Sequence, residues 1–411
     1  MPVPLIRPNP PRLSEAAARL REIEDSGTFS NYGPVNTAFE QDLISEMFAG
    51  EGGCMTVCNA TIGLMLAVQQ AIGRRPTRPR YALMPAFTFA AAAHAALWCG
   101  LTPLFCDIDP ETWTACAADE KRLLARYGKD IAVVMPYATF GYNLDLDRYA
   151  AMTERHGVPV VVDAAASLGT MSAPGRGFGT GFNGLIVYSM HATKSFATGE
   201  GGIIYSANQD AIAQLRQMSN FGFGKPRTAT MAGLNAKLSE VGALLAHLRL
   251  GEYGPVLTRR TELMHGYRQG LPELTFQPEL PDQQAHQFAP GLLPRRLAAR
   301  RGEVMAALAA SGIGCATYFS PHLQEQEYFI EHGVVRGLPV TDDVAGRIIS
   351  LPLFDDMTQA DLAEVIGVVR HTLARMSKVS RPRAARKAVT PAIRHVLPPQ
   401  NPGLSPDMLP A

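Results

Sequence analysis

Short apolar segments alternate with helix-like segments between Gly53 and about Ser206. The short segments are rich in β-branched and aromatic residues, and they predict strands at Tyr81–Phe87, Pro103–Ile108, Ile131–Tyr137, Val158–Val162, Gly184–Met190 and Gly202–Ser206. The segments between them predict helices at Thr61–Ile72, Phe89–Cys99, Ala117–Tyr127 and Leu146–His156. Near-continuous apolar strands separated by helices are typical of a mostly parallel sheet covered on both faces. We therefore predict an α/β fold and expect ligands at the carboxyl ends of its strands.

The pattern changes after Asn220. A Gly-rich stretch at Phe221–Gly224 leads into the segment KPRTATMAG, and a long helical pattern follows from Leu238 toward Tyr267. A second α/β unit is expected next, with strands at Leu274–Gln277 and Ala316–Phe319 and helices at Ala299–Ser311 and Gln359–Met376. We thus expect an N-terminal segment and large domain over residues 1–250 and a smaller C-terminal domain over 251–376. The basic, Pro-rich tail over 377–411 is expected to be disordered, with a weak contact to an anion as the alternative.

Composition narrows the class of protein. The 411 residues are 46% hydrophobic and 18% charged, and the formal net charge is +1. This apolar content supports a large buried core, while the near-zero charge gives no basic excess for a nucleic-acid backbone. The first twelve residues lack the apolar run of a signal peptide, and no apolar stretch approaches the roughly 20 residues of a membrane-spanning helix. We therefore expect a soluble cytoplasmic protein that binds neither nucleic acid nor membrane.

Two motifs suggest sites that their context argues against. Gly179–Gly184 matches G-x-G-x-x-G, but that dinucleotide motif must follow a strand and open a helix, whereas here it precedes an apparent strand. Cys54 and Cys58 suggest zinc, but no second compact Cys/His pair follows them. None of the six cysteines forms a CxxC pair, so we interpret them as buried thiols and predict no disulfide framework and no metal.

Three other positions carry chemistry. Asp163 ends an apolar strand, where a carboxylate is costly to bury without a cationic partner. Lys194 lies just beyond another strand in a loop of small residues, where partial desolvation lowers the pKa of an amine and makes it reactive toward carbonyl groups. Asn59-Ala60-Thr61 opens a helix, whose free N–H groups can bind an anion. Taken singly, these residues also fit a helix-capping Asp, a surface lysine and an ordinary N-cap.

Together the three positions fit one ligand, pyridoxal 5′-phosphate (PLP). PLP requires a lysine for its aldehyde, an acid for its pyridinium nitrogen and a helix terminus for its phosphate. Phe89 ends another predicted strand and offers an aromatic face to the ring. The acid matters because it keeps the ring nitrogen protonated, which makes the cofactor an electron sink.

The sequence resembles the DegT/DnrJ/EryC1/StrS family of sugar aminotransferases, which have the aspartate aminotransferase fold (fold type I). The resemblance extends from about Gly27 to about Met376. The motifs that carry it occur in family order: Ser30–Pro34 with Phe39-Glu40, Asn59–Thr61, Pro85–Phe89, Phe105–Pro110, Val162–Ala165, Ser189–Gly202, Gly233–Glu240 and Ser350–Phe354.

The resemblance implies a set of cofactor contacts. Lys194 would be the lysine that bonds the PLP aldehyde, and Asp163 the partner of its pyridinium nitrogen. Ser189 and Thr61, with the backbone at Ala60, would hold the phosphate. Phe89 would stack on the ring.

The resemblance also implies a partner and substrates. Asn235, in a Gly-x-Asn motif, would reach the phosphate of the neighbouring subunit's cofactor, so we expect a homodimer with shared active sites. The loop Phe221–Ala232 is a candidate lid over a diphosphate. The expected substrate contacts are Tyr32, Lys225, Arg227, Tyr318 and His322, with a structural role as the alternative for the last two.

The sequence departs from the family pattern at several of these motifs. Ala166 stands where family members often carry a Gln that meets the cofactor's phenolic oxygen, so another group or a water molecule must satisfy that oxygen. Ala60 replaces a common Gly, and Lys237 replaces a common Arg after Gly-x-Asn. A frequent His is absent from the segment Met135–Thr139.

The implied reaction is transfer of an amino group from an amino acid, L-glutamate in this family, to a keto-sugar linked to a nucleotide. A keto-cyclitol is an alternative acceptor. The family's dehydratase branch carries His at the position of the lysine, so Lys194 argues against dehydration. A regulatory protein that keeps the fold without catalysis is the alternative from another class.

Overall fold

The strands that carry the candidate site form two sheets. In the computed structural model, which describes residues 2–73 and 80–378 of the chain, their bounds are β1 (Gly53–Val57), β2 (Tyr81–Pro85), β3 (Thr102–Cys106), β4 (Ile131–Val134), β5 (Val161–Asp163), β8 (Leu185–Ser189) and β9 (Gly202–Ser206). The first of these two sheets has the strand order β1-β9-β8-β5 and the second has the order β3-β2-β4. Parallel bridges Val134–Val160 and Tyr137–Asp163 connect the end of β4 to β5. β9 is antiparallel to both of its neighbours, and the other pairs are parallel.

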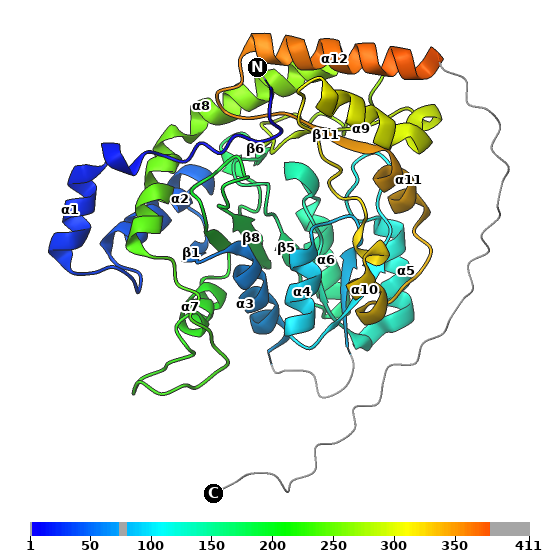
Figure 1. Ribbon diagram of the computed structural model, residues 1–411. Coiled ribbons are helices and arrows are strands. Elements are labelled where there is room, and N and C mark those ends of the chain that lie inside the picture. Colours follow the sequence, from blue (N-terminus) through cyan, green and yellow to red (C-terminus); the bar gives the residue numbers. More distant parts are fainter. Residues whose placement is uncertain (1, 74–79, 379–411) are drawn as a thin grey trace, which may run out of the picture. The chain divides into compact units, whose positions relative to one another are not determined.

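Helices connect and cover these strands: α3 (Ala60–Ile72), α4 (Ala90–Trp98), α5 (Ala117–Tyr127), α6 (Leu146–His156) and α7 (Gln209–Met218). α5 and α6 have the predicted bounds, and α3 begins one residue earlier than predicted. α3 packs against α4 and also against β8 and β9 (Figure 1). The predicted α/β fold with a mostly parallel sheet and flanking helices is therefore confirmed.

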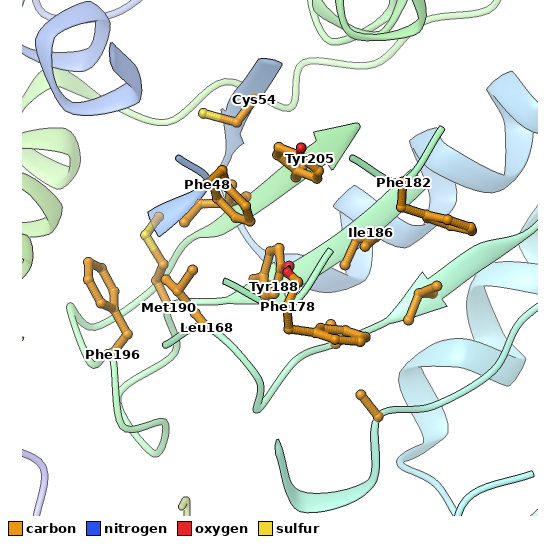
Figure 2. Close-up of a cluster of buried hydrophobic side chains, with 14 of the residues drawn as sticks. Phe48, Cys54, Leu168, Phe178, Phe182, Ile186, Tyr188, Met190, Phe196 and Tyr205 are labelled. Atoms are coloured by element: carbon orange, nitrogen blue, oxygen red, sulfur yellow. The ribbon is translucent and has the colours of Figure 1, made fainter. Parts of the chain in front are cut away.

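Both faces of the sheet are buried, which explains the near-continuous apolar strands in the sequence. Ile186 and Tyr188 of β8 belong to one hydrophobic cluster, whereas Leu185 and Val187 belong to another, because successive strand side chains point to opposite faces. Figure 2 shows Ile186 and Tyr188 in the first cluster, with the Phe48 and Tyr205 rings beside them. These two rings stack with their centroids 4.1 Å apart.

Further helices surround this core or form the C-terminal part of the chain. Their bounds are α1 (Ala17–Ser26), α2 (Pro34–Met47), α8 (Glu240–Gly270), α9 (Arg301–Ala310), α10 (Glu327–His332), α11 (Pro339–Arg347) and α12 (Gln359–Lys378). The longest of these helices is α8 (Figure 1). Its N-cap is Ser239, whose side chain accepts the Gly242 N–H. A separate hydrophobic cluster joins the C-terminal half of α8 to α9 and α12 through residues such as Leu263, Leu308 and Val365.

The C-terminal sheet differs from the prediction. It consists of β10 (Ala289–Leu292) and β11 (Ile348–Leu351), which are antiparallel. The strands expected at Leu274–Gln277 and Ala316–Phe319 are wrong, because among the described residues each segment makes only one isolated bridge, Thr275–Leu292 and Ala316–Ser350. At Gln277, hydrogen bonds that involve side chains replace strand pairing. The backbone carbonyl of Gln277 accepts from the Arg268 guanidinium, and the Gln277 side-chain amide donates to the Thr112 carbonyl.

The remaining expectations about organisation have different outcomes. Contacts group the described residues up to Ser377 into one compact unit, and the division expected at residue 250, which α8 crosses, stays a prediction. The first two residues of the expected tail, Ser377 and Lys378, belong to α12, and the rest of the tail lies outside the described residues. Gly179–Gly184 ends immediately before β8, in the order that argued against a dinucleotide site. In the described part of the chain, no helix combines the length and the apolar character needed to cross a membrane.

Candidate active site

A cavity of about 540 Å³ lies where β5 and β8 end and α3 begins. It is lined by six of the seven expected cofactor residues: Ala60, Thr61, Phe89, Asp163, Ser189 and Lys194. Tyr318, an expected substrate contact, lines it as well. Segments from Ala60 to Tyr318 therefore meet around one space, at the strand ends where a parallel sheet binds ligands.

Close packing around two glycines holds the lysine loop against the helix terminus. The loop leaves β8 at Ser189 and returns as β9 at Gly202. Gly201 has a φ of +153°, and a Cβ there would lie 2.5 Å from the Met190 Cε. A Cβ at Gly202 would lie 2.8 Å from the backbone nitrogen of Ala60. The start of β9 thus lies directly against the first residue of α3, which explains why the sequence has glycines here.

Asp163 is a buried acid at the end of β5, with 2% of its surface exposed. One carboxylate oxygen accepts the Ala165 N–H at 3.1 Å. Burial raises the pKa of Asp163 from 3.8 to about 6, while the Ala165 N–H and the nearby Lys194 amine oppose this rise. The carboxylate therefore lacks sufficient compensation for its burial, and a further cationic donor would stabilise it.

Lys194 has the complementary perturbation. The side chain keeps partial exposure, but its amine is withdrawn from water, and this desolvation lowers the pKa from 10.5 to about 8 against the opposing attraction of Asp163. Its Nζ donates a hydrogen bond to Oε1 of Gln287 at 3.1 Å. Because this partner is a neutral amide, it does not hold the lysine in its charged form as a carboxylate would.

The start of α3 provides an anion-binding end to the cavity. Asn59 is the N-cap, and its Oδ1 accepts the Ile62 N–H at 2.9 Å. The N–H groups of Ala60 and Thr61 lie in the first turn, so no carbonyl group within the helix can accept from them. They point outward from the positive end of the helix. Ser189, whose Oγ accepts the His191 N–H at 3.2 Å, also lines the cavity. These groups suit a phosphate.

Aromatic side chains form another wall of the cavity. Phe89, the N-cap of α4, is 58% exposed although it is a large apolar residue. Its ring centroid lies 6.5 Å from that of Phe319, and Phe288 stacks on Tyr318 at 4.9 Å. The exposed face of Phe89 is thus free to pack against a planar ring.

Five of the expected site residues do not line this cavity: Tyr32, Lys225, Arg227, Asn235 and His322. The Tyr32 hydroxyl instead bonds the Ser219 hydroxyl at 2.5 Å, and the exposed Asn235 accepts from Lys237 at 2.7 Å. His322 is 1% exposed, and its Nε2 lies 3.0 Å from an oxygen of Asp342. Its burial favours a structural role over contact with substrate.

Sequence reasoning missed several cavity residues, of which Gln287 is the most informative. Besides accepting from Lys194, it donates from Nε2 to the Thr193 carbonyl at 3.1 Å. Tyr137, Phe288 and Phe319 also line the cavity. No local pattern marks these residues as site residues, because they come from separate parts of the sequence that only the fold brings together.

The cavity residues fit PLP. The buried Asp163 carboxylate calls for a cationic donor, the Lys194 amine has a pKa low enough for reaction with an aldehyde, and the α3 terminus offers N–H groups to a phosphate. In the described part of the chain, no group of three or more His, Cys, Asp or Glu side chains could hold a metal.

The fold and this cavity are those of a PLP-dependent enzyme of fold type I. The sequence model of the DegT/DnrJ/EryC1/StrS aminotransferase family matches residues 12–370, so the chain belongs to this family and is a PLP-dependent aminotransferase. The resemblance inferred from the motifs, and the expected cofactor, are therefore confirmed.

Individual relatives match most of the chain. Protein Rv3402c of Mycobacterium tuberculosis (strain H37Rv) is 31% identical over 379 residues, which cover 91% of this chain and 90% of the relative. A solved structure from Bacillus cereus ATCC 10987, assigned as a PLP-dependent aminotransferase, has a TM-score of 0.85 and 36% identity, covering 90% of this chain and all of that one. The structure of DesI in the presence of its TDP-sugar product has a TM-score of 0.81 and 30% identity, covering 91% and 94% of the two chains.

Proposed function

We propose that this aminotransferase moves an amino group from L-glutamate to a keto-sugar carried on a nucleotide. The observation that carries the proposal is the meeting of a lysine amine of lowered pKa, a buried acid and a helix terminus in one cavity. The family is one of sugar aminotransferases, and DesI, a structural relative, has a TDP-sugar product. Glutamate as the donor rests on the family resemblance.

The residues that would hold PLP have separate tasks in this proposal. Ser189 and the N-terminus of α3 at Ala60 and Thr61 would hold the phosphate, Phe89 would pack on the ring, and Asp163 would pair with the ring nitrogen. Bound PLP supplies an aldehyde that captures amines and a ring that accepts electrons from the substrate carbon. Asp163, with a pKa of about 6, is mostly ionised at neutral pH and so stabilises positive charge on its partner.

Lys194 is the residue that moves the proton. With a pKa of about 8, roughly one-tenth of the amine is neutral at pH 7, whereas an amine at 10.5 would be almost fully charged. Its Nζ can therefore accept a proton from the substrate's α-carbon and return it, as general base and then general acid. Gln287 and Asp163 keep the amine within the cavity while it does so.

We also propose a homodimer in which Asn235 reaches the neighbouring subunit's cofactor phosphate. Asn235 belongs to a surface segment with exposed apolar side chains, since Phe221 is 46% and Leu234 38% exposed. A second copy of the chain would cover this apolar surface. Lys225 and Arg227 lie on the same exposed segment, where their charge suits the diphosphate of a nucleotide-linked sugar, and Tyr32 and Tyr318 complete the proposed substrate contacts.

Donor half-reaction and acceptor screening test the proposal in turn. L-glutamate should bleach the visible band of the PLP-loaded enzyme and release 2-oxoglutarate, whereas Lys194→Ala should show neither change. Nucleotide-linked keto-sugars should then restore the band and be aminated. Bleaching by no amino acid would contradict aminotransfer, and amination of keto-cyclitols alone would contradict the sugar acceptor.

A further inference from the structure

Gln287 is the cavity residue whose position calls for explanation. It is 5% exposed, its Oε1 accepts from the Lys194 Nζ at 3.1 Å, and its Nε2 donates to the Thr193 carbonyl at 3.1 Å. A glutamine amide has two N–H donors, so one remains for a ligand in the cavity that Gln287 lines. The side chain therefore offers a donor directly beside the reactive amine.

The segment that carries Gln287 lies near the turn that follows Asp163. The two segments meet at Gly141, whose φ is +84°. A Cβ at Gly141 would clash with the Ala285 carbonyl and lie 3.0 Å from the Ala166 carbonyl. Ala166, at the position where the family often has Gln, is itself only a buried methyl group and offers no donor.

The chemistry of PLP connects these observations. The ring carbon that bears its aldehyde has two neighbours, one carrying the phenolic oxygen and the other the phosphate arm. A group beside the lysine nitrogen, on the side away from the phosphate arm, is therefore within reach of the phenolic oxygen. We propose that the Gln287 amide donates a hydrogen bond to the phenolic oxygen of the cofactor, in place of a glutamine at position 166. This inference rests on the proposed function, because it requires PLP to bond Lys194.

A donor to the phenolic oxygen has a measurable spectroscopic effect. The negative charge on the phenolic oxygen stabilises a proton on the Lys194 nitrogen that is bonded to the cofactor. A hydrogen-bond donor to this oxygen weakens that effect. Loss of the donor therefore raises the pH at which the visible band titrates. A hydrogen bond to a charged oxygen corresponds to a shift of about 1 pH unit. The variants leave the other titratable residues that line the cavity unmutated: Asp163 on β5, Tyr137 after β4, His191 and Glu200 in the lysine loop, and Tyr318.

The test compares absorbance titrations of PLP-loaded wild type, Gln287→Ala and the double variant Gln287→Ala/Ala166→Gln. Gln284→Ala is the matched control, because Gln284 is 6% exposed on the same segment but does not line the cavity. We expect Gln287→Ala to titrate about 1 pH unit higher than wild type, the control to match wild type, and the added glutamine at 166 to bring the transition back.

The outcomes separate this inference from the proposed function. If Gln287→Ala carries PLP on Lys194 but titrates like wild type, the phenolic contact is refuted while aminotransfer stands. If wild type itself forms no lysine-dependent band with PLP, the proposed function is refuted and the contact with it.

Discussion

Replacing Asp163 with Asn should stabilise the cofactor-free protein while it abolishes most of the activity. The side chain is 2% exposed, and its pKa is raised from 3.8 to about 6 chiefly by burial. A rise of about 2 pKa units corresponds to about 3 kcal/mol that the folded protein loses when this carboxylate ionises. Asn keeps the acceptor for the Ala165 N–H but adds a buried amide whose own N–H groups cost about 1–2 kcal/mol if they lack acceptors. We therefore expect a net gain of about 1–2 kcal/mol near pH 7.

The sign of the pH dependence follows from the direction of the pKa change. A raised pKa means that the folded protein binds this proton more tightly than the unfolded chain does. The stability of wild type therefore falls as pH rises from about 4 to about 6 and stays lower above that range, whereas Asp163→Asn lacks this contribution. The variant should therefore have its full advantage well above pH 6 and be about 1–2 kcal/mol less stable than wild type below about pH 4, where only the cost of the buried amide remains.

Urea unfolding of the two apoproteins at equal protein concentration, near pH 4 and near pH 7, measures this difference. Turnover of the PLP-loaded variant should fall at least about 100-fold, because the ring nitrogen loses its charged partner. An apo variant that unfolds at lower urea than wild type near pH 7 would refute the reasoning. So would full turnover, which would remove Asp163 from its proposed role.

Three further predictions concern the lysine, the phosphate end and the dimer. The rate at which apoprotein captures PLP should rise with pH and level off above about pH 8, because only the neutral Lys194 amine adds to an aldehyde. Stopped-flow absorbance measures this rate, and a pH-independent rate would contradict Lys194 as the reactive amine. Gly202→Ala should weaken PLP binding at least about tenfold in equilibrium dialysis, because its Cβ would lie 2.8 Å from the Ala60 nitrogen. The control is Gly251→Ala, whose Cβ meets nothing within 4 Å, and equal affinities of the two variants for PLP would count against the site. Mixing inactive Lys194→Ala and Asn235→Ala subunits should restore about a quarter of wild-type activity, since half the dimers would hold one intact site; no recovery after verified subunit exchange would contradict site sharing.

Local signals explain why much of the fold could be predicted. α6 has its predicted bounds because Asp145 caps its first turn, accepting the Arg148 N–H, and Gly157 ends it with a φ of +64°. The small sheet was missed because β10 contains Pro290 and Gly291, which are poor strand formers. Its pairing with β11 joins residues about 60 positions apart, so only tertiary contacts stabilise it.

The candidate site divides in the same way. Asp163 and Lys194 could be predicted because strand ends in a parallel sheet meet at one edge, and both residue types are unusual there. Gln287 could not, because it lies 93 residues from Lys194 and glutamine is common in many environments. The sequence of one chain also cannot test the proposed role of Asn235, because that role requires a second subunit.

Reduction of the PLP-loaded protein with borohydride, followed by peptide mass spectrometry, would identify the residue that bonds the cofactor. We predict a phosphopyridoxyl group on the peptide that contains Lys194 and on no other, with the label absent from Lys194→Ala. Labelling of a different lysine, or none in a protein that retains aminotransfer, would contradict the assignment of Lys194 as the reactive amine.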